Sequence, residues 1–138
     1  MGRTTARLAV ENIFDVQKVA EGAISPDQVR RVELDAIVDT GASLVCLPRS
    51  DIAKLGLLLN RTVPVRTANG GVTRRTFMGA RIILNGRDFQ MEIMENDDQT
   101  PPLIGVLILE VLDLVVDPKS EKLIANPAHD GQWVLDLY

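Results

Sequence analysis

The sequence predicts a mostly β fold, a small closed β-barrel with one short helix near the C-terminus. Two observations favour this fold class. Many short runs of the chain alternate apolar and polar residues, and two Asn-Gly pairs lie between such runs. Asn-Gly flanked by alternating residues is the strongest short-range signal for a β-hairpin. Because short strands joined by tight turns are typical of barrels and closed sheets, we expect a single domain over residues 1–138.

The first third of the chain predicts two strands. Residues 5–19 alternate loosely, whereas residues 30–38 alternate cleanly and place Val32, Leu34 and Ala36 on one face. The polar segment between them contains Ser-Pro-Asp-Gln, which predicts one helical turn with Ser25 as the N-cap.

A short strand and a helix are predicted next. The strand covers residues 44–47 and ends at Pro48. Residues 49–57 then predict a short helix, with Ser50 as its N-cap and Gly56 near its end.

Two hairpins follow in the sequence. The first spans residues 63–78 and turns at residues 69–71. The second joins residues 80–84 to residues 89–94 through a turn at residues 85–87.

The C-terminal part predicts short apolar elements. They are a strand at 102–104, a helix at 106–112, strands at 114–116 and 122–125, and a terminal apolar segment at 133–138.

Composition limits the functional classes. The net charge is −4, with 15 basic and 19 acidic residues, so no basic stripe predicts nucleic-acid binding. The single cysteine, Cys46, excludes an internal disulfide and fits a reducing compartment. No apolar run reaches the roughly 20 residues of a membrane span, and the N-terminus lacks a secretory pattern. We therefore expect a soluble, cytoplasmic protein with an aliphatic core and no membrane partner.

The most informative motif is Asp-Thr-Gly-Ala-Ser at residues 39–43. It follows the apolar residues 36–38, so Asp39 stands where a buried strand ends. Burying a carboxylate is costly unless it is hydrogen-bonded or paired. Asp39 is therefore a candidate for acid–base chemistry.

A second element lies about 65 residues further along, where Leu103-Ile104-Gly105 precedes the predicted helix. In this order, the two elements resemble those of the retropepsin-like aspartic proteases, the single-domain relatives of pepsin. The resemblance covers about residues 31–124 and includes the Asn-Gly-Gly hairpin turn.

This resemblance implies a role for each matching residue. Asp39 is the catalytic carboxylate, Thr40 hydrogen-bonds to its mate in a partner chain, and Gly41 lets the substrate backbone approach. Ile104 and Gly105 support the catalytic loop, and the hairpin at residues 63–78 is the flap. The implied substrate-binding residues are Gly41, Ala42, Ala68, Asn69, Gly70 and Gly71.

The chain has one Asp-Thr-Gly, but the chemistry needs two carboxyl groups that share a proton. We therefore expect a homodimer with its active site on the twofold axis, acting on peptides or proteins without a metal or cofactor. In the viral relatives terminal strands form the interface, which here points to the N-terminal segment and residues 133–138.

The chain departs from the family pattern in two places. No aromatic residue stands near the flap tip, where Arg74-Arg75 follows the turn, and the N-terminal stretch 8–31 is longer than the minimal viral enzymes need. Four arginines allow two interpretations: they favour acidic substrates, or they form a solvated strand face. They are Arg66, Arg74, Arg75 and Arg81.

Several other interpretations stay open. Asp39 also fits a turn aspartate that caps its own loop, the hairpin fits a plain surface hairpin, and Cys46 fits a buried core residue. A catalytically weak or inactive peptide-binding module on the same fold is the alternative function. The motif is also similar to the first phosphate loop of actin-like ATPases and sugar kinases, but that fold needs a longer chain and a second phosphate loop.

We expect activity to peak near neutral rather than strongly acidic pH. Ala42 offers no hydroxyl to the catalytic carboxylate, in contrast to the pepsins. With one hydrogen bond fewer to its charged form, the carboxyl pair should have a higher pKa. A pH–rate profile of peptide hydrolysis measures this, and a maximum well below about pH 4 contradicts it.

Overall fold

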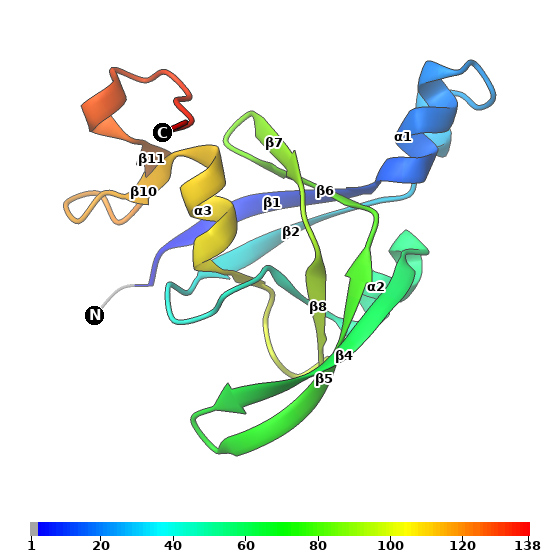
Figure 1. Ribbon diagram of the computed structural model, residues 1–138, viewed down its shortest axis with the longest axis horizontal. Helices are drawn as coiled ribbons and strands as arrows, with labels where there is room; N and C mark the ends of the chain where they lie inside the picture. The colour runs from blue at the N-terminus through cyan, green and yellow to red at the C-terminus, as the bar shows by residue number, and fades with distance from the viewer. Residues whose placement is uncertain (1–2) are drawn as a thin grey trace.

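The computed structural model describes residues 3–138 (Figure 1). One nine-stranded sheet, in the order β4-β5-β8-β3-β9-β2-β1-β6-β7, curls into a half-barrel, and β10 and β11 form a separate small sheet. The mostly β prediction is confirmed. The strands are β1 Thr5–Asn12, β2 Arg31–Val38, β3 Cys46–Pro48, β4 Leu58–Thr67, β5 Gly70–Met78, β6 Ala80–Leu84, β7 Arg87–Gln90, β8 Ile93–Asn96, β9 Leu103–Ile104, β10 Leu114–Val116 and β11 Leu123–Ala125. The helices are α1 Ile13–Ala20, α2 Arg49–Leu55 and α3 Val106–Leu112, with 3₁₀ turns η1 Pro26–Gln28 and η2 Pro127–His129.

The core is aliphatic, as the composition predicts. Leu8 of β1, Ile82 of β6, Ile104 of β9 and Ile108 of α3 are all fully buried in one cluster. Phe77 is the one aromatic member of that cluster among the described residues. Burying each side chain of this size contributes roughly 1.5–3 kcal/mol.

β1 lies inside the sheet, paired with β2 along Thr5–Glu11 and with β6 along Ala9–Asn12. The predicted strand at residues 5–19 is wrong beyond Asn12, where α1 begins. Asn12 is fully buried, and its side-chain oxygen accepts from the N–H groups of Phe14 and Asp15 at 2.9 and 3.1 Å. This capping bond ends the strand and starts the helix.

Asp15 joins α1 to the start of β2. Arg30 donates to the Asp15 carboxylate from Nε at 2.8 Å, from Nη2 at 3.0 Å and from its backbone N–H at 3.0 Å. The side-chain hydrogen bonds from Arg30, against the opposing effect of burial, lower the pKa of Asp15 to about 2. The predicted helical turn between these elements is confirmed as η1, with Ser25 as its N-cap.

The second predicted hairpin is correct only in its first half. β6 and β7 pair around the Asn-Gly turn, but the predicted strand 89–94 splits after Gln90. β8 leaves this hairpin and pairs in parallel with β3 and antiparallel with β5. Long-range pairing, which buries Ile93 completely, therefore outweighs continuation of the local hairpin.

The predicted helix after Pro48 is confirmed as α2, but Ser50 is not its N-cap. Pro48 occupies that position, and Gly56 is the C-cap. The N–H and hydroxyl of Ser50 instead donate to Asp98 Oδ1 at 3.0 and 3.1 Å. α3, β10 and β11 lie where the sequence predicts them.

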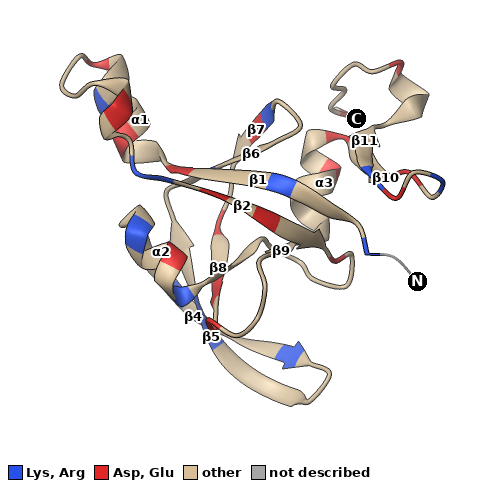
Figure 2. Cartoon of the chain, turned by 180° about the vertical axis from the view of Figure 1, so that it is seen from behind, with Lys and Arg blue, Asp and Glu red and all other residues tan. Residues whose placement is uncertain are grey.

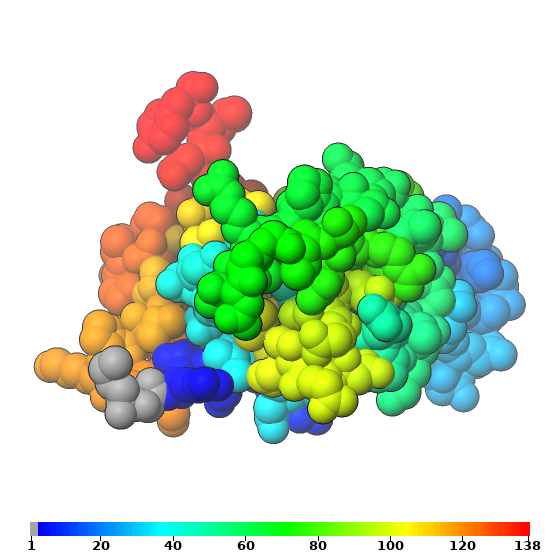
Figure 3. All heavy atoms as spheres, turned by 90° about the horizontal axis from the view of Figure 1, so that it is seen from below, coloured from blue at the N-terminus to red at the C-terminus, as the bar shows by residue number. Residues whose placement is uncertain are grey.

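The C-terminal segment runs over the end of α3 without forming a strand. Trp133 Nε1 donates to the Val111 carbonyl at 2.8 Å, and the N–H of Val134 donates to Asp113 Oδ2 at 3.2 Å. Leu137 and Tyr138 are fully exposed, and the C-terminal end of the chain, red in Figure 3, projects from the body.

No helix within residues 3–138 has the length and apolar character needed to cross a bilayer. Basic and acidic positions are interspersed over the back of the sheet (Figure 2). There Arg7 of β1 pairs with Glu33 and Asp35 of β2 at 3.4 and 3.2 Å.

We expect Asp15→Asn to lower the free energy of unfolding by about 1–2 kcal/mol at neutral pH. Because the pKa of Asp15 is lowered in the folded protein, its ion pair stabilises the folded state at pH values above the usual carboxyl pKa of 3.8. That contribution disappears as the pH falls toward about 2.

Urea unfolding of the wild type and the variant between neutral pH and about pH 2 measures the difference, which should shrink below about pH 4. Asp35→Asn, at an exposed ion pair, is the matched control and should change little. A difference that stays constant with pH contradicts the assignment.

Candidate active site

The loop that carries Asp39 begins where β2 ends. The N–H of Asp39 donates to the carbonyl of Ile104 at 2.9 Å, because β2 and β9 pair in parallel with Val38 opposite Ile104. Within the loop, the N–H of Gly41 donates to Asp39 Oδ1 at 2.9 Å, and the N–H of Ala42 donates to the Asp39 carbonyl at 3.0 Å. These bonds fix the backbone of Asp39 and one of its carboxylate oxygens.

Thr40 and Gly41 form the turn of this loop, and both are exposed. A Cβ atom on Gly41 would lie 3.2 Å from Asp39 Oδ1. Glycine at this position therefore leaves room for the carboxylate itself, a constraint that adds to the one predicted for a substrate backbone.

Gly105 packs directly behind the loop. A Cβ atom there would lie 2.5 Å from the Leu44 carbonyl oxygen and 2.6 Å from the Ser43 carbonyl carbon. Carbon atoms do not approach the backbone this closely, so any other residue must move the loop. Ile104, next to it, is fully buried.

The N-terminus of α3 closes on the same loop. The N–H of Val106 donates to the Ala42 carbonyl at 2.8 Å, and the N–H of Leu107 donates to the Ser43 carbonyl at 3.2 Å. The first N–H groups of a helix have no partner within the helix, and here the loop supplies two. The loop is thus held by β9 at its start and by α3 at its end.

A cleft of about 690 Å³ opens beside this loop, and Asp39 lines it. The loop contributes residues 41–44, and the β4–β5 hairpin forms another wall with residues 63–68, Val72 and Arg74. In Figure 3 the green hairpin lies across the cyan segment that contains the Asp39 loop. The rest of the lining comes from Cys46, Met94, Asn96 and Leu103.

The structure brings together some of the predicted substrate-binding residues. Gly41, Ala42 and Ala68 line the cleft, whereas the Asn-Gly-Gly segment at 69–71 lies at the exposed hairpin tip, outside the lining. Because Thr67 pairs with Gly70, the two-residue turn is Ala68-Asn69, one position earlier than predicted. The Thr67 hydroxyl closes it with a 2.7 Å bond to the Gly70 carbonyl.

Sequence reasoning missed the contribution of β8 to the cleft. Met94 and Asn96 line it because β8 lies between β3 and β5 in the sheet. No local pattern identifies that position, since it depends on two long-range pairings. Val72 and Arg74 follow from the period-2 alternation of β5, which the sequence does contain.

A family model described as aspartyl protease matches residues 21–107. The match begins before β2 and ends just after Gly105, so it contains both the Asp39 loop and the hairpin. The chain belongs to the aspartyl protease family. The predicted resemblance to retropepsin-like members is confirmed.

Among solved structures, the chain is similar to EIAV protease complexed with the inhibitor HBY-793. The match covers 79% of this chain and 86% of that chain, with 17% identity and a TM-score of 0.55, and it supports the retropepsin-like fold. The search of curated proteins gave no significant match.

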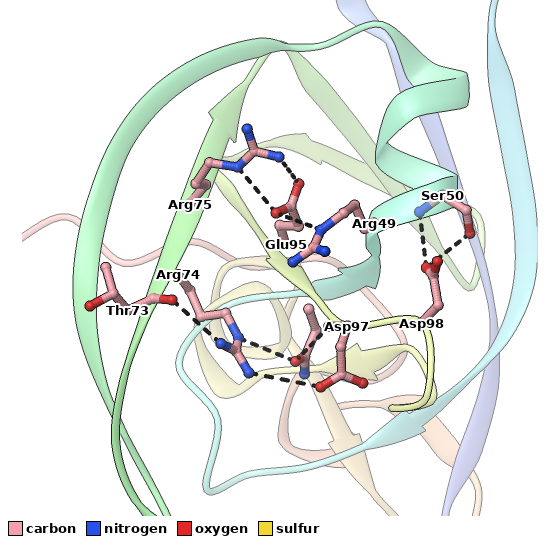
Figure 4. Close-up of polar contacts among 9 residues, drawn as sticks. Arg49, Ser50, Thr73, Arg74, Arg75, Glu95, Asp97 and Asp98 are labelled. Carbon is pink, nitrogen blue, oxygen red and sulfur yellow. Dashed lines mark hydrogen bonds and ion pairs between the residues drawn. The ribbon is translucent and has the colours of Figure 1, made fainter.

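An ion cluster anchors the base of the hairpin. Arg75 of β5 donates to the buried Glu95 of β8 at 2.7 and 3.1 Å, and Arg49 of α2 donates to it at 3.2 Å (Figure 4). Burial acts to raise the pKa of Glu95, but hydrogen bonds from Arg75 and Arg49 outweigh it and keep that pKa below its usual value. The cluster therefore ties three elements together with a charged carboxylate.

Cys46 is a buried thiol, as one sequence interpretation holds. Burial, and secondly the Asp39 carboxylate, raise the pKa of Cys46 to about 11. The thiol is therefore neutral at physiological pH and not a nucleophile. Across residues 3–138, no group of three or more His, Cys, Asp and Glu is arranged to hold a metal ion.

We expect Gly105→Ala to lower the free energy of unfolding by about 2 kcal/mol or more, because its methyl group overlaps the backbone of Ser43 and Leu44. Chemical denaturation measures the change. Gly71→Ala is the matched control, since its Cβ would meet no atom closer than 4.0 Å. Equal stability of the two variants contradicts the packing role of Gly105.

Proposed function

We propose that this chain is an aspartic endopeptidase that hydrolyses peptide bonds with a water activated by a pair of Asp39 carboxyl groups. The observation that carries the proposal is the position of Asp39, held by three hydrogen bonds with backbone groups at the edge of a cleft beneath a long hairpin. Membership of the aspartyl protease family supports the same reaction class.

The pair consists of Asp39 and Asp39 of the partner subunit in a C2 homodimer, since each 138-residue chain supplies one Asp-Thr-Gly. Two carboxyl groups in close contact do not both ionise, so they share one proton and titrate as a unit. In the proposed pair, Thr40 hydrogen-bonds across the axis to the partner loop.

The chemistry follows from the shared proton. The ionised carboxylate takes a proton from the water while the water oxygen bonds to the scissile carbonyl carbon. The protonated carboxyl donates to the carbonyl oxygen. When the tetrahedral intermediate collapses, the C–N bond breaks and the carboxyl that took the proton from water donates it to the leaving nitrogen. A hydroxyl of the intermediate returns its proton to the other carboxylate, which restores the shared proton.

Rigidity of the loop favours this reaction, because catalytic groups must be held close to their reactive geometry. The contacts of Ile104 and Gly105 provide that support from behind. On the open side, we assign substrate binding to Gly41 and Ala42 at the loop and to the hairpin tip, residues 68–71, as a flap.

The C-terminal segment is the stronger candidate for the dimer interface. Leu135, Leu137 and Tyr138 are large apolar side chains that are at least 60% exposed. In contrast, β1 is paired on both edges from Ala9 to Glu11, which leaves its Thr5–Leu8 stretch open on the β6 side within residues 3–138.

We expect Asp39→Asn to abolish peptide hydrolysis while the protein stays folded, because an amide cannot accept the proton from water. Cleavage of a proteome-derived peptide library, read by mass spectrometry, measures the loss. Thermal unfolding of both proteins is the control for folding. Residual cleavage by Asp39→Asn at the wild-type rate contradicts the assignment.

Mixing wild-type and Asp39→Asn chains tests whether the site is shared. After subunit exchange at a 1:1 ratio, about one quarter of random dimers contain two intact carboxyls, so activity falls to about a quarter of that of wild type at the same total concentration. Independent monomers would retain about half. Equally poor cleavage by both pure proteins would favour the peptide-binding module instead.

A further inference from the structure

Arg74 places a positive charge inside the cleft. Along β5, the side chains of Val72, Arg74 and Thr76 lie on one face of the strand, and Thr73, Arg75 and the buried Phe77 lie on the other. Val72 and Arg74 both line the cleft. The guanidinium of Arg74 is therefore on the face of β5 that lines the cleft.

The contacts of Arg74 are long. Its Nε donates to Asn96 Oδ1 at 3.4 Å, its Nη1 donates to the Thr73 carbonyl at 3.4 Å, and its Nη2 lies 3.8 Å from Asp97 Oδ2 (Figure 4). The neighbouring Arg75 reaches Glu95 at 2.7 Å. A guanidinium has five N–H donors. Arg74, 27% exposed, thus keeps donors that a ligand in the cleft can use.

The surroundings of Arg74 favour an acidic ligand. Within residues 3–138, Asp39 is the one carboxylate that lines the cleft, and Arg66 lines it as a second cation. After burial, Asp39 and Arg74 are the two influences on the pKa of Cys46, which the first raises and the second lowers. Both charges therefore act on the same part of the cleft.

We propose that Arg74 is a specificity-determining residue that binds an acidic side chain, Asp or Glu, of a peptide lying in the cleft. The planar guanidinium matches a carboxylate with two parallel hydrogen bonds. Repulsion from Asp39 places that acidic side chain on the hairpin side. The preference of Arg74 in cleavage rests on the proposed peptidase function, whereas its binding of an acidic peptide does not.

Arg74→Met tests the proposal, because it keeps the length of the side chain and removes its charge. Cleavage sites of a proteome-derived peptide library should show Asp or Glu enriched at one position for the wild type and not for the variant. For a matched pair of peptides with Glu or Gln at that position, the variant should lose about tenfold in kcat/KM on the Glu peptide, mainly through KM. The Gln peptide should be cleaved as before.

Two further variants serve as controls. Arg7→Met removes the same charge from an ion pair on β1, outside the cleft, and should keep the wild-type preference. Arg66→Met distinguishes the contribution of Arg66 to the acidic preference from that of Arg74. Loss of the acidic preference in Arg66→Met and not in Arg74→Met overturns the assignment, as does a wild type without any preference for acidic residues. Thermal unfolding checks that each variant is folded.

Equilibrium binding separates this inference from the proposed function. The probes are fluorescein-labelled Ala-Val peptides in which one Glu is moved through each position, with Gln twins, measured by fluorescence anisotropy. Arg74-dependent binding of a Glu peptide without cleavage would refute the peptidase function and sustain the role of Arg74. Equal binding of Glu and Gln peptides, or binding of neither, would refute the role of Arg74.

Discussion

The close backbone contact between Gly105 and the Ser43–Leu44 segment is the constraint on which the rest of the site depends. Because Gly105 has no Cβ atom, β9 and α3 approach the loop closely enough to form hydrogen bonds with both of its ends. Asp39 is thereby held at the end of a buried strand with its carboxylate facing the cleft. Neither the loop nor the helix N-terminus would be fully hydrogen-bonded without the other.

Charges are used in two different ways around the hairpin. Arg75, Glu95 and Arg49 form short bonds that fix the base of the hairpin to β8 and α2. Arg74, one residue away, faces the opposite side and keeps donors for a ligand. The period-2 alternation of a strand separates these roles, since adjacent side chains point to opposite faces.

Local signals predicted the elements that depend on local physics. The helix at 106–112, the strand ending at Val38 and the turn capped by Ser25 all lie where the sequence places them. The errors arise where distant groups decide. Asn12 turns a strand into a helix because its side chain caps α1 while donating to the Leu55 carbonyl at 2.9 Å. β8 leaves its hairpin because pairing with β3 and β5 buries Ile93.

The sequence by itself determined the chemistry available to this protein: one Asp-Thr-Gly after an apolar strand, a supporting Leu-Ile-Gly and a long hairpin. These are short-range patterns. A carboxylate at the end of a buried strand costs free energy unless it is paired or hydrogen-bonded, which is why Asp39 indicates a functional site. Only the tertiary structure decided which residues of β8 line the cleft with Asp39. Met94 and Asn96 reach the cleft because β8 pairs with β3 and β5, and such pairings between strands apart in sequence are set by the packing of the whole sheet.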